Sequence, residues 1–135
     1  MKRLYDYWER TRGSRPMPER KDIDPVEMQF ILGHIALIDI VPRPARFRVR
    51  LQGTEFVWWT GCDLTGRTLD ALPLPDIRAL ADKCLGQVAD SGVPWHGSER
   101  RMLDDRLRVF EALILPLAAE GDQATMLLAA VRCCQ

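Results

Sequence analysis

A stripe of apolar and aromatic side chains marks the first element that the pattern predicts. Leu4 and Trp8 are four residues apart, with Tyr5 beside them, which is typical of one face of an amphipathic helix. We therefore expect a helix over residues 1–12. Two prolines and a glycine within residues 13–18 cannot continue it.

A second helix is predicted between Asp24 and Gly33. Asp24 can cap free backbone amides, and Pro25 suits the first helical position. Gly33 is a typical helix terminator. Residues 1–33 are therefore expected to form a helical extension ahead of a compact unit at residues 34–135.

The period then changes to that of strands. Residues 35–41 form a largely apolar, β-branched run, which suits a well-buried strand. In the next segment, residues 46–51, arginines alternate with apolar side chains, so this second strand should have one face in water. The alternating residues are Arg46, Arg48 and Arg50 against Phe47, Val49 and Leu51.

Helices are predicted next, before three more strands. A short helix over residues 54–60 should end at Gly61, and a helical turn should follow at 69–72. The longest of these helices, over residues 76–89, carries apolar side chains on one stripe and ends before Gly92.

The last part of the chain is expected to form three strands joined by short turns, at residues 95–102, 107–117 and 124–133. The last two are rich in leucine and alanine, so helices are the competing prediction there, but Pro116 and the turn residues favour strands. The order of elements predicts an α+β fold, a five-stranded antiparallel sheet with helices inserted between the second and third strands. The space between these helices and the sheet could hold side chains or a small molecule.

Charge and composition narrow the function without naming it. Nineteen basic and nineteen acidic residues cancel, so the chain lacks the basic field that attracts nucleic acids or acidic lipids. No apolar run approaches the roughly 20 residues of a membrane span, and the first residues lack the apolar centre of a signal peptide. We therefore expect a cytoplasmic protein with no nucleic-acid partner and no membrane partner.

The cysteines fit reduced thiols rather than a metal centre. None of the four belongs to a C-x-x-C pair, and neither His34 nor His96 lies near a cysteine in the sequence. Cys84 lies on the apolar stripe of the long helix, where a buried thiol behaves as a small hydrophobe. We predict no metal site.

Six short fragments stand in a characteristic order and spacing. They are Leu4-Tyr5-Asp6-Tyr7-Trp8, Arg15-Pro16-Met17-Pro18, Asp22-Ile23-Asp24-Pro25, Leu51-Gln52-Gly53-Thr54, Gly61-Cys62-Asp63-Leu64-Thr65-Gly66-Arg67 and Leu115-Pro116-Leu117. Together with the order of elements over residues 35–133, they resemble the PAS sensory domain, in particular a short bacterial subgroup often found with little else attached. The resemblance implies a ligand-sensing or signalling module, commonly a homodimer, and not an enzyme.

The cofactor stays unknown, and two cofactors of better-known PAS groups are not expected. Flavin-binding light sensors of the family carry an Asn-Cys-Arg-Phe-Leu-Gln type motif, whereas the residues around Cys62 differ from it. Haem-binding relatives present a histidine from the long helix, and residues 76–89 contain none.

A ligand in the predicted cavity should meet side chains from the inserted helices and from the third and fourth strands. Core packing is the competing role for the large side chains. Alternation sends only one of Trp95 and His96 to the covered face, and the sequence leaves open which. The expected ligand-binding residues are Trp59, Leu69, Leu80, Cys84, His96 and Phe110.

The stripe of Leu4, Tyr5 and Trp8 must bury its apolar face somewhere. It can pack on the chain's own sheet or on a second chain, and the resemblance favours a dimer interface.

Three functions are therefore compared. The first is a PAS-type sensory or protein-interaction domain, whose output passes through a signalling partner or a dimer, because this sequence has no kinase, cyclase or DNA-binding segment. The second is a small α+β enzyme or carrier with a cone-like barrel for an apolar ligand, although no phosphate loop or nucleophile motif is present. The third is a scaffold whose core is filled by its own side chains.

Overall fold

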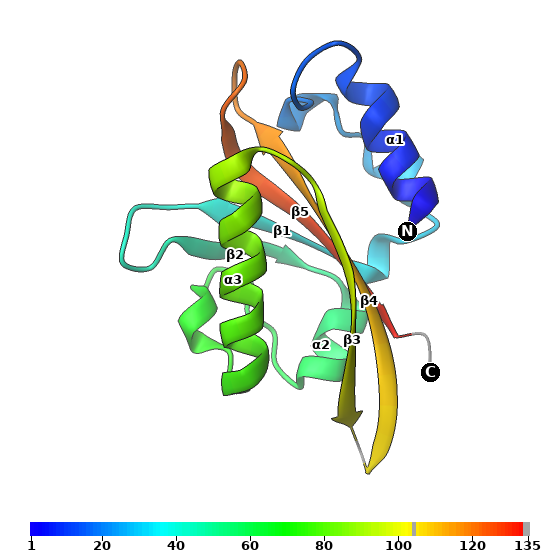
Figure 1. The fold of residues 1–135 in the computed structure, drawn as a ribbon, viewed down its shortest axis with the longest axis vertical. Coiled ribbons are helices and arrows are strands. Elements are labelled where there is room, and N and C mark those ends of the chain that lie inside the picture. The colour runs from blue at the N-terminus through cyan, green and yellow to red at the C-terminus, as the bar shows by residue number, and fades with distance from the viewer. Residues whose placement is uncertain (104, 134–135) are drawn as a thin grey trace.

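The structure, a computed structural model, describes residues 1–103 and 105–133, apart from the side chains of Trp59 and Leu103. Its centre is one antiparallel sheet in the order β2-β1-β5-β4-β3 (Figure 1). The strands are β1 (Ile35–Ile40), β2 (Phe47–Gln52), β3 (Trp95–Leu103), β4 (Arg106–Ala118) and β5 (Ala124–Cys133). The predicted five-stranded α+β architecture is confirmed.

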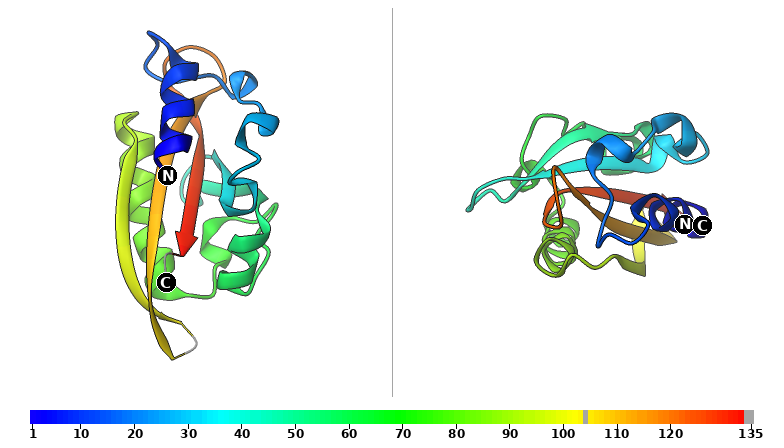
Figure 2. Two further views of the ribbon diagram at one scale, coloured as in Figure 1. Left: turned by 90° about the vertical axis from the view of Figure 1, so that its right-hand side faces the viewer. Right: turned by 90° about the horizontal axis from the view of Figure 1, so that it is seen from above.

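The strand order separates this fold from a simple meander. β1 pairs with β2 on one side and with β5 on the other, so the end of the chain returns to the middle of the sheet. β3, β4 and β5 follow one another through short hairpins, and so do β1 and β2. The β3–β4 hairpin extends well beyond the other strands (Figure 2).

Three helical elements lie between β2 and β3 and cover one face of the sheet, called the inner face here (Figure 1). They are α2 (Thr54–Thr60), η4 (Leu69–Ala71) and α3 (Pro75–Ser91). Gly61 and Gly92 end α2 and α3 with φ of 74° and 69°, a left-handed conformation that glycine adopts without steric cost. Both predicted helix ends are confirmed.

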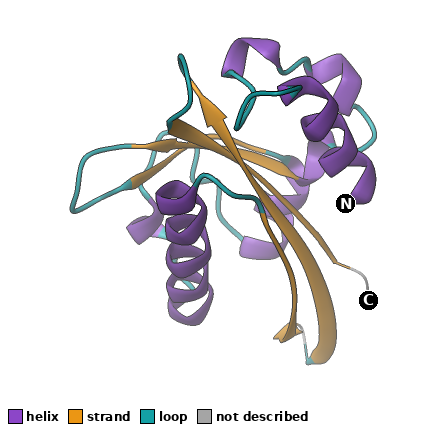
Figure 3. Cartoon of the chain, turned by 45° about the horizontal axis from the view of Figure 1, so that its top comes forward, coloured by secondary structure: helices purple, strands orange, loops and turns teal. Residues whose placement is uncertain are grey.

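The first 34 residues cover the opposite, outer face of the sheet (Figure 3). They contain α1 (Lys2–Arg12) and three single 3-10 turns, η1 (Arg20–Asp22), η2 (Pro25–Met28) and η3 (Leu32–His34). α1 packs against β4, and the backbone amide of Ala118 donates to the carbonyl of Pro18.

The second predicted helix is wrong in type. Asp24 does accept a hydrogen bond from the amide of Val26, as expected of a cap, but the segment forms the turns η2 and η3. Met28 and Ile31 are buried while the intervening residues are exposed. An i, i+3 repeat suits the three-residue period of 3-10 turns, so this short segment buries its apolar side chains without a full helix.

The arginine ridge predicted on the second strand is also only partly correct. Arg50 pairs with Asp39 across the strands, with both carboxylate oxygens 3.1 Å from Nε. Arg46, however, has φ of 64° and its guanidinium turns to Asp90 at the end of α3. Leu51 is half exposed, because a register shift between Leu37 and Ile38 interrupts the alternation.

Two apolar clusters pack on the two faces of the sheet. The outer cluster combines α1 and the 3-10 turns with Leu115, Leu117 and Leu128. The inner cluster combines α2, η4 and α3 with Ile114 and Leu127. Alternation along β4 and β5 thus supplies both clusters, and the inner one borders the cavity described below.

Candidate functional site

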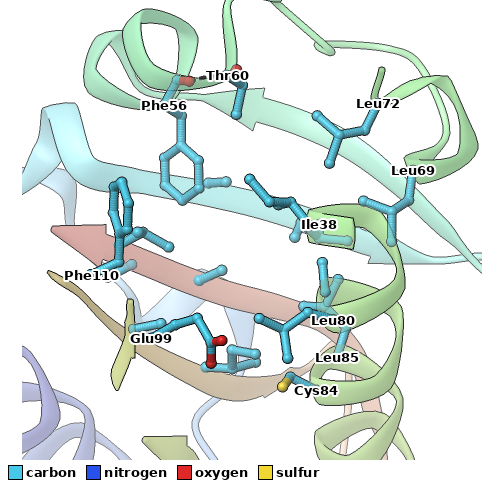
Figure 4. A pocket seen from close by; sticks show the side chains of 18 of the residues that line it. Ile38, Phe56, Thr60, Leu69, Leu72, Leu80, Cys84, Leu85, Glu99 and Phe110 are labelled. Carbon is cyan, nitrogen blue, oxygen red and sulfur yellow. Dashed lines mark hydrogen bonds between the residues drawn. The ribbon is translucent and has the colours of Figure 1, made fainter. Parts of the chain in front are cut away.

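The inner cluster surrounds a cavity of about 170 Å³ between α3, α2 and the sheet (Figure 4). Its wall is almost entirely apolar. Ile38 contributes from β1, Phe56 from α2, Leu69 from η4 and Leu80 from α3, and Phe110 closes one side from β4. Five separate elements therefore line one apolar, partly open cavity.

Strand alternation and helix period explain why these side chains meet. On β4, Phe110, Ala112 and Ile114 are two residues apart and all face the cavity. On α3, Leu80 and Cys84 are one helical turn apart and face the same space. Ala112 is small, so the wall recedes at its centre.

Four of the six predicted ligand-binding residues lie on the cavity wall. They are Leu69, Leu80, Cys84 and Phe110. Their contact with a ligand stays a prediction. The fifth, Trp59, belongs to α2, but its side chain lies outside the part of the chain that the structure describes.

The sixth predicted residue, His96, is not on this wall. Its imidazole is exposed, and Nε2 lies 3.0 Å from Oε2 of Glu111. Arg132 also donates to Glu111, at 3.1 Å. The three side chains form a polar cluster on the outer face, because His96 has the opposite parity to its neighbour Trp95.

Trp95 occupies the place where we expected His96. Its indole folds back over Gly97, where an added Cβ would come within 2.6 Å of the ring. Trp95 and Gly97 both line the cavity, as does Glu99 on the next alternate position of β3. Trp95 and Gly97 are two residues apart, so strand alternation could have shown from the sequence that they share a face.

A few polar side chains interrupt the apolar wall. The amide oxygen of Gln52 accepts a hydrogen bond of 2.6 Å from the backbone of Leu64. The Thr60 hydroxyl donates to the carbonyl of Phe56 at 2.6 Å, which satisfies it inside α2. Glu99 and Arg101 stand at the end of the wall formed by β3. Sequence reasoning missed all four, because polar side chains carry no apolar periodicity.

The thiol of Cys84 belongs to the apolar wall and not to a reactive centre. Burial raises the pKa of Cys84, and the negative charge of Glu99 adds to this, while Lys83 acts in the opposite direction with a larger influence than Glu99. A raised pKa keeps the thiol protonated and a poor nucleophile at neutral pH. Among the described residues, no group of three or more His, Cys, Asp or Glu side chains is placed to hold a metal ion.

The cavity is small for the cofactors of better-known PAS groups. Drug-sized ligands occupy pockets of about 300–1,000 Å³, and the volume of about 170 Å³ lies below that range. Within the described wall there is also no histidine, and Cys62 is not part of it. The residues present thus suit a small apolar group better than a flavin or a haem.

The aromatic stripe of α1 packs on the chain's own sheet. Leu4 is fully buried and Trp8 is 2% exposed. The indole of Trp8 donates to the carbonyl of Pro116 at 3.0 Å, and Tyr5 stacks on Trp8 with ring centres 5.9 Å apart. Leu4 and Trp8 therefore offer no surface to a second chain in this structure, contrary to the predicted interface, and only Tyr5 retains partial exposure.

The fold is similar to several solved structures. The Rhodobacter sphaeroides LOV protein matches with 17% identity and a TM-score of 0.55, over 83% of this chain and 69% of that chain. The PAS domain of a protein from Colwellia psychrerythraea matches with 15% identity and a TM-score of 0.53, over 81% and 96%. A sensory box sensor histidine kinase from Vibrio cholerae matches with 10% identity and a TM-score of 0.53, over 82% and 92%.

These identities are low, so the likeness concerns the fold. In one RsLOV structure, the match spans only 59% of that chain. No curated protein matches this chain. No helix within the described residues is long and apolar enough to cross a membrane.

The family comparison covers almost the whole sequence. A family described as the PAS domain matches residues 1–131, which include α1 and the 3-10 turns as well as the sheet. PAS domains are generally sensory or signalling modules and are typically not catalytic. With its strand order, inserted helices and inner cavity, the chain belongs to the PAS domain family.

Proposed function

We propose that this chain is a sensory domain that binds a small apolar ligand in the inner cavity and passes the signal to a partner protein or through a homodimer. The observation that supports this most is the largely apolar, partly open cavity of about 170 Å³. Apolar cavities of about 150 Å³ can stay dry and bind ligands of the size of benzene. The cavity thus has a volume suited to a small hydrophobic molecule.

The other two functions have less support. A self-filled scaffold would have no reason to keep a space of this size, because unfilled volume in a core costs stability. A simple meander through all five strands would favour a cone-barrel enzyme or carrier, whereas β1 lies between β2 and β5. We therefore favour sensing over catalysis.

The output step follows from population shift. A ligand changes an equilibrium only if it binds one conformation better than another. The cavity wall contains α3 on one side and strands β3 and β4 on the other, so filling it acts on both layers. A partner or a second chain that contacts either layer would receive the change.

The homodimer and the cytoplasmic location form part of this proposal. Leu4 and Trp8 are buried within one chain, so the dimer would use another surface. Replacing Trp8 by Ala is expected to leave the subunit number unchanged in light scattering, even where it lowers stability. A loss of the dimer at a concentration where the variant is still folded would place α1 in the interface after all.

The ligand proposal is tested by filling the cavity from one side. Ala81 and Ala79 lie on α3, but only Ala81 lines the cavity and Ala79 is exposed. Native mass spectrometry of freshly purified protein should show a retained small molecule or, after addition, bound benzene-sized probes. Ala81→Leu should reduce retention or affinity by about tenfold, which is the effect of ~1.4 kcal/mol.

Ala79→Leu is the matched control and should bind like the wild type. If the wild-type chain retains no molecule and binds no apolar probe, ligand sensing through this cavity is wrong. Equal binding by both variants would place the ligand elsewhere.

A further inference from the structure

Two arginines stand opposite each other on the inner face of the β3–β4 hairpin. Arg101 on β3 pairs in register with Arg108 on β4. Side chains of directly opposed residues share a face and lie about 5 Å apart at Cβ. The neighbouring inner pair on the cavity side is Glu99 and Phe110, both of which line the cavity. The arginine pair therefore continues the cavity wall toward the hairpin tip.

Both guanidinium groups have an unused donor. The Nε atoms of Arg101 and Arg108 are buried, and neither has a hydrogen-bond partner among the described residues. Buried donors without acceptors are rare in folded proteins, and each calls for an explanation. Like charges directly opposed on a sheet also repel each other. Both features would be relieved by an anion between the two side chains.

Glu99 does not fill this role. Its Oε1 lies 3.6 Å from the outer Nη2 of Arg101, which is too long for a hydrogen bond. Among the described residues, Glu99 is the carboxylate that pairs with Arg101, and the Nε of Arg108 is left without an acceptor. An added carboxylate could accept from both arginines, since guanidinium groups match carboxylates in geometry.

The place of the pair defines the rest of the ligand. Arg101 lines the cavity, and the space next to it is bounded by apolar side chains such as Phe110 and Ile114. A purely inorganic anion would leave this apolar space empty. A molecule with an apolar end and one carboxylate would use both.

We propose that the cavity takes a small apolar monocarboxylate, whose carboxylate is bound between Arg101 and Arg108 while its apolar end fills the space beside Phe110. This inference rests on the proposed ligand-binding function and names the chemical class of the ligand. The volume of about 170 Å³ suits an apolar end of roughly one aromatic ring.

The test compares two probes of equal size that differ in charge. Phenylacetate carries the carboxylate, and phenethyl alcohol has the same ring and chain length with a neutral end. Isothermal titration calorimetry at low salt should show phenylacetate binding about tenfold more tightly, because hydrogen bonds to charged groups are the stronger ones.

Three variants locate the charge preference. Arg101→Gln and Arg108→Gln should each lower the affinity for phenylacetate about tenfold and leave the alcohol unchanged. Glu99→Gln removes the competing carboxylate and should strengthen phenylacetate binding severalfold. Arg100→Gln is the matched control, because Arg100 is exposed and pairs with Val109 on the outer face. Circular dichroism of each variant establishes that it is folded.

The outcomes separate the two proposals. If the alcohol binds as tightly as the acid, or if Arg101→Gln and Arg100→Gln behave alike, the carboxylate site is wrong while the apolar cavity stands. If neither probe binds the wild-type chain, both proposals fail. Should an arginine variant not fold, the Glu99→Gln result decides, and an unchanged or weaker affinity for phenylacetate overturns the site.

Discussion

At the scale of single residues, Gly53 allows two segments, η3 and α2, to pack closely against each other. Gly53 ends the second strand and precedes α2, with φ of −69°, so its conformation is open to any residue. Its role is steric. A Cβ at this position would overlap the backbone carbonyl of Gly33, which lies against it, and a carbonyl in a packed turn cannot move aside easily. The two glycines let η3 and α2 approach each other.

Gly53→Ala should therefore lower the free energy of unfolding by about 1–3 kcal/mol, the range of an overpacked core site. Gly33→Ala is the milder control, because its Cβ would meet the side-chain oxygen of Thr54 at 3.3 Å, and a side chain can turn away. Urea denaturation measures both. Equal losses in the two variants would show that the close approach of the Gly33 carbonyl does not set the cost, since conformational entropy alone would favour alanine at both positions.

The outer-face cluster of Glu111, His96 and Arg132 predicts a pH dependence. The hydrogen bond with His96 is the largest influence and lowers the pKa of Glu111 below its ordinary 4.5, helped by Arg132 and opposed by partial burial. A carboxyl with a lowered folded pKa stabilises the protein above its unfolded pKa. This contribution is lost as the pH falls below 4.5 through the folded pKa.

Glu111→Gln should accordingly lower the free energy of unfolding at about pH 7. On acidification to about pH 3.5, the variant should lose less stability than the wild type. Chemical denaturation at the two pH values measures the difference. Glu120→Gln, in the exposed turn before β5, is the control and should leave the slope unchanged. A Glu111→Gln slope identical to the wild-type slope would show that the cluster is not formed in solution.

At the scale of elements, the sequence predicted type and order well and facing poorly. β1 follows from a β-branched run, β2 from alternation of apolar and charged residues, and the ends of α2 and α3 from glycine terminators, which are local effects. The facing of β3 could not be derived, because Glu99 and Arg101 on the inner side are no more apolar than Ser98 and Arg100. Alternation predicts facing only where the two faces differ in polarity.

The same dependence on facing explains which parts of the candidate site the sequence predicted. The apolar wall was predictable from the stripe of α3 and from β4, whereas the arginine pair depends on the cross-strand register. The turn sets the register within a hairpin, so the opposition of Arg101 and Arg108 follows from it, but the sequence did not show that these two residues lie on the covered face. The sequence also did not show where the apolar stripe of α1 packs, because it packs on a surface made by strands that are distant in the chain.

α1 is expected to be a structural part of the fold. Trp8→Ala removes a side chain that is 2% exposed and its hydrogen bond to Pro116, and should cost about 3–5 kcal/mol. Trp8→Phe keeps most of the packing and should cost about 1–2 kcal/mol for the unpaired carbonyl. Tyr5→Ala removes a half-buried side chain, so its stability cost should be closer to that of Trp8→Phe. Urea denaturation that finds Trp8→Ala no worse than Tyr5→Ala would mean that α1 is not docked in solution.

At the scale of the whole molecule, the sheet is shared between two cores. Leu115, Leu117 and Leu128 are fully buried, and what covers them is α1 and the turns of residues 1–34. Residues 1–33 were predicted to be an extension beside a compact unit at 34–135. From this packing we expect the unit to depend on them, because an uncovered apolar face of this kind is an aggregation hazard.

A chain of residues 34–135 should therefore lose its cooperative thermal transition or aggregate, although it contains all five strands and the whole cavity wall. Adding a peptide of residues 1–33 should restore part of the transition, since the outer core would form again across the cut. A soluble 34–135 chain with the wild-type melting temperature would establish the extension as dispensable. In that case the outer face must be stabilised by another contact, and the predicted homodimer would be the first to examine, because a second copy could then cover the face that α1 leaves free.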